Sequence, residues 1–369
     1  MTTTGTDSRR LRLGTRGSRL ALTQSGQVAE ALRQAAAAGA LGEGSGGLGI
    51  DLVTVRTDGD GDRTPLRQLG GVGVFAARLR HALLDGEVDL VVHSFKDLPT
   101  QPVEGLEVIC VPPREDPRDA LCARDGLTLA TLPEGARVGT GSPRRAAQLL
   151  ATRPDLEVVD LRGNVPTRLA RVRGLEAVGV DTDEPVAPAR ADAAGDLDAV
   201  VLALSGLRRL GLEHCASEVL DLETMLPAPA QGALAVEARA GEDSVELARA
   251  VAVLDDDPTR LAVTAERAIM ARLGAGCAAP VGAWAHLRGG EQEQRVLVLR
   301  AVVTSLDGGQ EVGCELSTEL PEASGGPGAP GDTAAVRAAE ALGGRAAEVL
   351  LDDGADQIVD LHANKPRRD

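Results

Sequence analysis

The segment GEVDLVVHSFKDLPT, residues 86–100, joins an apolar strand to a set of polar side chains. Its first part, VDLVV (88–92), has the near-continuous apolar order of a buried strand. The residues that follow supply an imidazole, a hydroxyl, an ammonium and a carboxylate, from His93, Ser94, Lys96 and Asp97. Pro99 then prevents the strand from continuing. The segment therefore predicts a buried strand that delivers reactive groups at its carboxyl end.

Apolar runs and helical patterns alternate on both sides of this segment, as in α/β proteins with mostly parallel sheets. The first series has strands at 11–15 and 50–55 and helices at about 18–38 and 74–85. The second has strands at 136–140, 156–160 and 198–203 and helices at about 143–152 and 164–173. Two similar series predict two α/β lobes.

A third region follows Asp257-Pro258, where Asp257 suits a helix N-cap and Pro258 the first turn. The helix extends to about Leu273, and a strand at 296–303 and an Ala-rich helix at 332–351 follow. This region predicts a small α+β domain. Three Gly- or Pro-rich segments are expected to be surface loops or insertions without an assigned function: 39–49, 181–197 and 323–331.

Composition excludes several classes of partner. The net charge is −16 and only three residues of 369 are aromatic, which disfavours nucleic acid and anionic membrane surfaces. No apolar run is long enough to span a bilayer, and the N-terminal residues lack a signal-peptide core, so a cytoplasmic protein is expected. The five cysteines are widely spaced without a CxxC pair, which predicts reduced thiols and no metal site.

Arginine and small polar residues recur beside glycine after four predicted strands. The segments are GTRGS (14–18), GTGSPRR (139–145), LRGNVPTR (161–168) and SGLRRLG (205–211). Any one surface arginine is usually just solvated, but together they place many guanidinium groups where open α/β sheets bind ligands. Because guanidinium binds carboxylates bidentately and no P-loop pattern is present, a polycarboxylate is the expected ligand.

Asp97 and Cys277 are the candidates for chemistry. A carboxylate facing arginines would oppose an anion, so Asp97 is interpreted as a general acid/base or as the counter-charge of a cation formed during reaction. The alternative is that Asp97 caps the turn before Pro99 and is neutralised by Lys96. Cys277 follows Gly274 and Gly276. A single cysteine is most often a small buried side chain, but a thiol in a Gly-flanked loop is also well placed to be a nucleophile or a covalent attachment point, so both interpretations stay open.

Eight blocks in order resemble the porphobilinogen deaminase (hydroxymethylbilane synthase) family, over residues of about 11–286. They are LGTRGSRLALTQS, VHSFKDLPT, REDPRDAL, VGTGSPRRAAQL, LRGNVPTRLARV, LALSGLRRLGL, LPAPAQGALAVE and TAERAIMARLGAGCAAPVG. The resemblance implies a transferase of haem biosynthesis that condenses four porphobilinogen molecules head to tail, with loss of ammonia, into hydroxymethylbilane. It also implies a dipyrromethane cofactor on Cys277 through a thioether.

The resemblance further implies an α/β fold with two periplasmic-binding-protein-like (type II) lobes of mostly parallel mixed sheets and a small C-terminal α+β domain. The first lobe is placed at 9–112 plus about 230–252, and the second at 113–229 with the insertion 181–197. The C-terminal domain, 255–369, carries the cofactor cysteine. A monomer without metal, nucleic acid or membrane partners is expected.

The matched motifs assign roles to individual residues. Asp97 is the expected catalytic acid. The expected cofactor contacts are Cys277, Lys96, Asp97, Ser142, Arg144, Arg145 and Arg162. The expected substrate contacts are Arg16, Ser18, Ser94, Thr140, Arg168, Arg209 and Gln231.

The chain departs from the family pattern in the glycine loop RQLGGVGVF (67–75), which lacks lysines, at Gly17, and at Ala230, where a glycine is usual. Two other functions remain open. A non-catalytic two-lobe protein that binds polycarboxylates would explain the arginines but not Asp97 or Cys277. A cysteine-dependent hydrolase would need a histidine near Cys277, and the neighbouring sequence has none.

Overall fold

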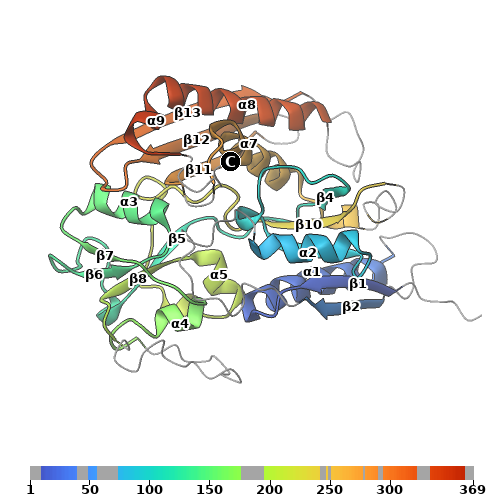
Figure 1. Ribbon diagram of the computed structural model, residues 1–369, viewed down its shortest axis with the longest axis horizontal. Coiled ribbons are helices and arrows are strands. Elements are labelled where there is room, and N and C mark those ends of the chain that lie inside the picture. Colours follow the sequence, from blue (N-terminus) through green and yellow to red (C-terminus); the bar gives the residue numbers. More distant parts are fainter. Residues whose placement is uncertain are drawn as a thin grey trace, which may run out of the picture.

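The structure is a computed structural model that describes residues 10–39, 49–55, 74–175, 195–241, 247, 251–276, 279–289, 294–321 and 333–361. It has three parts, each built on one sheet (Figure 1). Within the described ranges, none of the helices is both long and apolar enough to cross a bilayer.

The first lobe has a five-stranded sheet in the order β2-β1-β3-β10-β4. Its strands are β1 (Arg10–Thr15), β2 (Gly49–Thr54), β3 (Leu90–Ser94), β4 (Leu106–Cys110) and β10 (Leu234–Arg239). β10 is antiparallel to both of its neighbours, so the other four strands run in one direction. The helices are α1 (Arg19–Ala37) and α2 (Val74–Leu84). Ser18 caps α1, because its hydroxyl accepts a hydrogen bond from the Ala21 amide at 3.3 Å.

The second lobe repeats this design in the order β7-β6-β8-β5-β9, with β5 antiparallel to both neighbours. Its strands are β5 (Asp119–Ala123), β6 (Arg137–Gly139), β7 (Glu157–Val159), β8 (Ala199–Ala203) and β9 (Glu218–Val219). Its helices are α3 (Pro143–Thr152), α4 (Val165–Leu169) and α5 (Leu204–Arg209).

The helix expected at 164–173 is shorter than predicted. α4 ends at Leu169 because the chain then pairs with residues near 197, where Val172 forms a bridge with Leu197. The backbone amide of Arg173 donates to the Leu197 carbonyl at 3.0 Å, so tertiary pairing competes with the last helical turn.

Two crossover segments connect the lobes: residues 111–118 lead from β4 to β5, and residues 220–233 lead from β9 to β10. Each crossover leads into the strand that is antiparallel to its neighbours, β5 in the second lobe and β10 in the first. In the second crossover, Ala230 has a φ of 62°, in the left-handed region that favours glycine.

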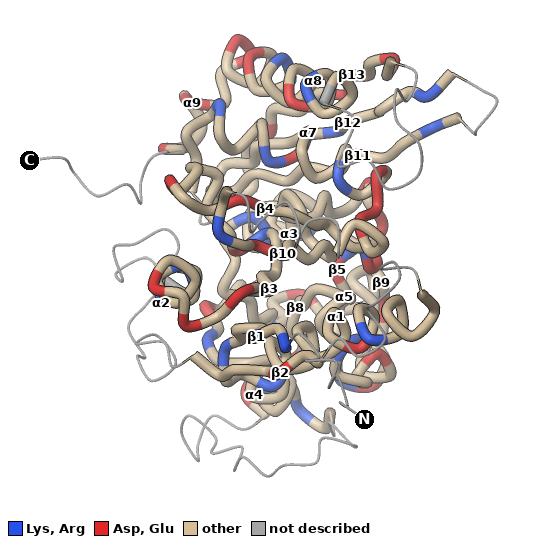
Figure 2. Tube along the Cα trace, turned by 90° about the vertical axis from the view of Figure 1, so that its right-hand side faces the viewer, with Lys and Arg blue, Asp and Glu red and all other residues tan. Residues whose placement is uncertain are grey.

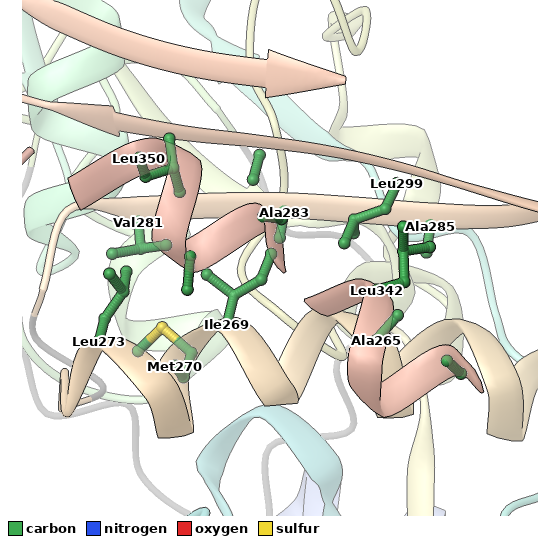
Figure 3. Close-up of a cluster of buried hydrophobic side chains, with 14 of the residues drawn as sticks. Ala265, Ile269, Met270, Leu273, Val281, Ala283, Ala285, Leu299, Leu342 and Leu350 are labelled. Atoms are coloured by element: carbon green, nitrogen blue, oxygen red, sulfur yellow. The ribbon is translucent and has the colours of Figure 1, made fainter. Parts of the chain in front are cut away.

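The C-terminal part is an antiparallel sheet of β11 (Val281–Arg288), β12 (Val296–Thr304) and β13 (Glu311–Glu319). The helices α7 (Asp257–Leu273) and α8 (Thr333–Asp352) contact this sheet, and α9 (Ala355–Ile358) follows α8. Figure 3 shows Ile269 and Met270 of α7 and Leu342 of α8 in one apolar cluster with β11. The helices approach closely at Gly343, where a Cβ would lie 2.1 Å from the Ala265 carbonyl oxygen.

One detail of the α7 prediction was wrong. The N-cap is Asp256 rather than Asp257, because the Asp256 carboxylate accepts the Thr259 amide at 2.9 Å. The described residues also include the short 3₁₀ turns η2 (Phe95–Asp97), η3 (Arg124–Gly126), η4 (Glu213–Cys215) and η5 (Ala252–Leu254).

The predicted fold class is confirmed: two type II lobes with mixed, mostly parallel sheets and a small α+β domain. The exact domain boundaries stay a prediction. The glycine-loop residues 67–73 and most of the segments 39–49, 181–197 and 323–331 lie outside the described residues.

Candidate active site

Asp97 ends the short turn η2 at the carboxyl end of β3. Its side chain is exposed, and within the described part of the chain no hydrogen bond to its carboxylate is found. The turn itself is fixed from several sides: the Phe95 amide donates to the Ala233 carbonyl at 3.0 Å, and Ser94 Oγ donates to Gln24 Oε1 at 3.0 Å. A rigid backbone thus presents an accessible carboxylate.

His93, the imidazole of the opening segment, points to a different cluster. Its Nε2 lies 2.9 Å from Glu237 Oε2, and Arg80 binds the same buried carboxylate, with Nη2 at 2.8 Å from Oε1. The three side chains come from β3, β10 and α2 and are largely buried. His93 therefore packs inside the first lobe rather than beside Asp97.

Lys96 lies between the two lobes. Its Nζ donates to Gln231 Oε1 at 3.2 Å. Burial and the charge of Arg145 lower the pKa of Lys96 to about 8, although Asp97 and Asp119 favour the charged form. Lys96 thus lies in a buried environment that contains both arginines and aspartates.

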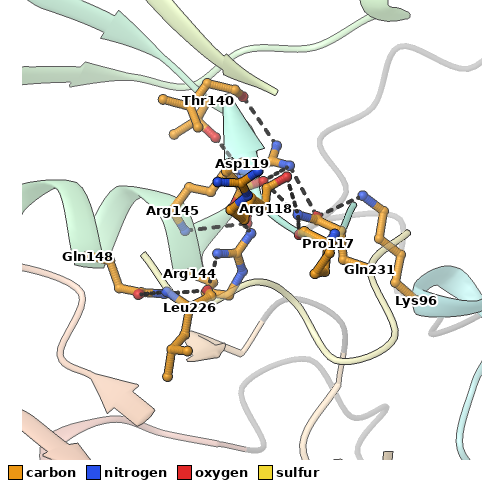
Figure 4. Close-up of polar contacts among 12 residues, drawn as sticks. Lys96, Pro117, Arg118, Asp119, Thr140, Arg144, Arg145, Gln148, Leu226 and Gln231 are labelled. Atoms are coloured by element: carbon orange, nitrogen blue, oxygen red, sulfur yellow. Dashed lines mark hydrogen bonds and ion pairs between the residues drawn. The ribbon is translucent and has the colours of Figure 1, made fainter. Parts of the chain in front are cut away.

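Asp119, the first residue of β5, holds two arginines of α3 (Figure 4). Arg144 Nη2 donates to Oδ2 at 2.7 Å, and Arg145 Nη2 donates to Oδ1 at 2.8 Å. Burial opposes ionisation of Asp119, yet the two guanidinium groups hold the pKa of its carboxyl well below the usual value. Since two cations share one anion, this cluster carries an excess positive charge.

Gln231, in the second crossover, joins these groups. Its Oε1 accepts from Lys96 and from Arg145 Nη2 at 3.3 Å, and its Nε2 donates to Asp119 Oδ1 at 2.8 Å and to the Pro117 carbonyl at 2.7 Å. The side chain is completely buried. In this conformation the Gln231 amide therefore bonds to other protein groups, and Gln231 would have to move to contact a substrate directly.

Two further expected arginines reach the same region from the second lobe. Burial, Arg145 and Arg162 lower the pKa of Arg168 to about 10, and Asp97 acts in the opposite direction. Arg168 of α4 thus lies within electrostatic range of the acid of the first lobe, and Arg162 lies close to Arg168. Arg145, Arg162 and Asp97 thus all influence the charge of Arg168 electrostatically.

The remaining expected contacts have mainly structural partners. Ser142 caps α3, since its hydroxyl accepts the Arg145 amide at 3.5 Å, and Thr140 Oγ1 accepts the Ser142 amide at 3.2 Å. Arg209 Nη2 donates to the Gly232 carbonyl at 2.6 Å and so connects α5 to the second crossover. Arg16, half-buried, and Ser18 lie where β1 passes into α1.

A pocket adjoins this cluster where all three parts of the molecule meet. Its walls come from the turn after η2, the start of α3, the second crossover, the end of α7 and the start of β11. Lys96, Ser142 and Arg144 line it, together with Ala275, Gly276 and Ala279. Cys277 lies outside the described residues, but residues on both sides of it contribute to the pocket wall.

Comparisons with known proteins agree with this arrangement. Residues 11–247 match the family model of the porphobilinogen deaminase dipyrromethane cofactor binding domain, and residues 260–352 match that of the porphobilinogen deaminase C-terminal domain. A porphobilinogen deaminase of Micrococcus luteus is 50% identical over 386 residues, which cover 97% of this chain and 98% of the relative. One of Cutibacterium acnes is 52% identical over 361 residues, covering 97% and 99%.

The chain belongs to the porphobilinogen deaminase family. Solved structures that are similar include the ectoine binding protein TeaA of a TRAP transporter, at 12% identity and a TM-score of 0.33, covering 66% of this chain and 75% of that chain.

The described residues fit the dipyrromethane cofactor of this deaminase family. The group carries several carboxylates and is attached at a cysteine. The pocket begins beside residue 277 and is lined by Lys96 and Arg144, next to the excess positive charge around Asp119. In the described part of the chain, no three His, Cys, Asp or Glu residues gather as metal ligands would.

The sequence did not reveal the buried ion pairs between acidic residues and these arginines. Asp119 and Arg114 lie in the block REDPRDAL, which the family resemblance includes without giving them a role. Arg114 makes two hydrogen bonds to buried Glu266 of α7, at 2.7 and 3.0 Å, and so joins the first crossover to the C-terminal part. No local periodicity reveals such pairs, because their partners are 25 to 152 residues apart.

Proposed function

We infer that this chain carries out the reaction of its family: it condenses four porphobilinogen molecules head to tail, with release of ammonia, to the linear tetrapyrrole hydroxymethylbilane. The observation that carries this conclusion is one exposed carboxylate, Asp97, within the electrostatic reach of Lys96 and Arg168. The cationic pocket beside it reaches the residues that flank Cys277.

Asp97 is the proposed acid and base. The aminomethyl group of porphobilinogen must take up a proton before it leaves as ammonia, and its departure leaves positive charge on the pyrrole. An ionised Asp97 stabilises that charge, and its acid form supplies a proton. Positioned acid–base assistance of this kind contributes about 10²–10⁴-fold to a rate.

The arginines are proposed to hold the acetate and propionate groups of the pyrroles. Arg16 and Arg168 would receive substrate carboxylates and Arg162 those of the cofactor. Further proposed substrate contacts are Ser18, Ser94, Thr140, Arg209 and Gln231. Arg144 and Arg145 already share Asp119, so their part is to supply the excess charge of the cluster and, with Lys96 and Ser142, to face the cofactor.

The dipyrromethane is proposed to be bound by Cys277 as a thioether, and when bound it supplies the pyrrole terminus to which the first substrate unit is joined. The chain's own residues hold its carboxylates and keep Asp97 beside the pocket. A monomer is proposed, as the family resemblance implies. The net charge of −16 supports an enzyme without nucleic acid partners, and a cytoplasmic location is proposed from the family's place in biosynthesis.

Intact-protein mass spectrometry tests the proposal. Purified protein is expected to carry a covalent addition of two pyrrole rings that is absent from Cys277→Ser. Asp97→Asn should still load this group but lose turnover by about 10²–10⁴-fold, measured as ammonia release. The matched control is Asp125→Asn, which changes a distant exposed aspartate and should keep full turnover.

An unmodified mass and no ammonia release from porphobilinogen would instead favour the non-catalytic two-lobe binder. If Asp97→Asn loads the cofactor and keeps normal turnover, Asp97 only caps the turn before Pro99.

A further inference from the structure

Arg267 of α7 holds the turn that carries Asp97, although it belongs to the C-terminal part of the chain. Its Nη1 donates to the carbonyl oxygens of Phe95 at 3.1 Å and Leu98 at 2.7 Å, and its Nη2 donates to that of Pro99 at 2.9 Å. One guanidinium therefore binds the backbone on both sides of Lys96 and Asp97.

The same guanidinium stacks on the first residue of the turn. Its central carbon lies 4.4 Å from the centroid of the Phe95 ring, and Phe95 is buried. A planar group with several donors can satisfy such carbonyls and stack at the same time, whereas a lysine ammonium presents a single point of charge. The geometry is specific to arginine.

Packing of Phe95 and Leu98 holds the side chains of this turn, and Arg267 adds hydrogen bonds to its backbone carbonyls. η2 is a single turn of three residues, followed at once by Pro99. The Leu98 amide donates to the Phe95 carbonyl at 3.2 Å, and that carbonyl is one of the three that Arg267 also binds. Without the guanidinium, the carbonyls of Leu98 and Pro99 would lose the bonds that orient the backbone next to Asp97.

α7 also leads to the cofactor attachment point. The helix ends at Leu273, six residues after Arg267 and about 9 Å farther along the axis. Gly274, with a φ of 60°, then turns the chain toward Ala275 and Gly276, which line the same pocket as Arg267. One rigid helix thus contacts the acid turn at Arg267 and begins the segment that contains Cys277.

We propose that Arg267 is a positioning residue for the condensation: it fixes Asp97 relative to the cofactor attachment point through α7, and it does so without binding substrate. The inference rests on the proposed function. The placement of a catalytic group matters strongly, since a shift of 1 Å can cost about 100-fold in rate.

The test compares Arg267→Ala and Arg267→Lys with wild type by intact mass, melting temperature, kcat and KM for ammonia release. Both variants are expected to load two pyrrole rings and to keep KM within about threefold, while kcat falls by about 10–100-fold in Arg267→Ala. Arg267→Lys should lose less. Because Arg267 lines the pocket, millimolar guanidinium should restore part of kcat in Arg267→Ala but not in Asp97→Asn.

Arg272→Ala is the matched control, because Arg272 lies on the same helix in an exposed ion pair with Glu348. It should leave kcat unchanged. A loaded, folded Arg267→Ala with normal kcat would overturn the proposal. A raised KM at constant kcat, or a failure to load the pyrrole rings, would also overturn it, because either result would indicate that Arg267 binds a ligand directly. If Arg267→Ala does not fold, a normal kcat in Arg267→Lys overturns it. Wild type that neither loads nor releases ammonia would refute the proposed function itself.

Discussion

At the scale of single residues, the charge of Lys96 depends on pH in the mildly alkaline range. Burial and then the charge of Arg145 lower its pKa to about 8, against the opposing effect of Asp97 and Asp119. Below that pH, Lys96 in the folded protein carries a positive charge that water would solvate better. Above it, Lys96 becomes neutral and this desolvation penalty is removed. Lys96 therefore opposes folding up to about pH 8, and this penalty decreases as the pH rises from there to the unfolded value.

The function of Lys96 depends on pH in the opposite sense. A neutral lysine no longer attracts carboxylates, so loading of the apoprotein by porphobilinogen should slow several-fold, relative to Lys96→Arg, as the pH rises through 8. Arginine stays charged over this range, and both proteins contain the same Cys277 thiol, so the variant corrects for thiol reactivity. Intact-mass time courses from pH 7 to 9.5 measure the effect. Parallel profiles for the two proteins would contradict it.

At the scale of elements, α3 is attached to its sheet by charge as well as by packing. Arg144 and Arg145, at its first turn, both bind Asp119 of β5, and Arg144 Nη1 donates to the Leu226 carbonyl at 2.5 Å. Gln148, one turn later, binds the backbone of Leu226 twice, at 2.8 and 3.1 Å. The helix is thereby fixed to β5 and to the second crossover.

Asp119→Asn should destabilise the protein by about 3–5 kcal/mol, because it leaves two buried guanidinium groups without their anion. Chemical unfolding of the apoprotein gives this value. As a control, Asp307→Asn changes an exposed aspartate in the β12–β13 turn and should cost less than about 1 kcal/mol. If both variants unfold at the same denaturant concentration, the shared carboxylate is not what holds α3.

At the scale of the whole molecule, the two lobes touch through apolar side chains of α1 and the second lobe. Leu20 of α1 packs against the apolar cluster of the second lobe, near Val165. Gly206 of α5 faces both: a Cβ there would lie 4.0 Å from each of these two side chains. Acidic and basic residues are interspersed along the chain in all three parts (Figure 2).

Gly206→Leu should therefore move the lobes apart. Overpacking costs about 1–3 kcal/mol, which favours the open arrangement by roughly 5–150-fold. Small-angle scattering should show a larger radius of gyration, and turnover should fall because Asp97 and Arg168 separate. Gly206→Ala is the control: an ordinary methyl contact should keep both properties. An unchanged radius in Gly206→Leu would show that the contact does not control closure.

Much of the local structure was predictable, and the failures have physical causes. Strands such as 11–15 and helices such as 143–152 follow from apolar periodicity and caps. β10 and β5 were not predicted, although both are largely buried, because each takes its place only after the chain has crossed between lobes. The site residues stay a prediction, and the sharing of Asp119 by two arginines was not predicted at all.

The sequence by itself determined the alternation of strands and helices, the polar residues at strand ends and the family, because these depend on neighbours a few residues apart and on ordered motifs. The tertiary structure decided which charges meet. It turned His93 toward Glu237, gave Arg144 and Arg145 one common carboxylate, and brought Arg267 to the turn of Asp97. Each of these contacts joins distant parts of the chain, so it exists only once the sheets have assembled and burial requires every charge and carbonyl to find a partner.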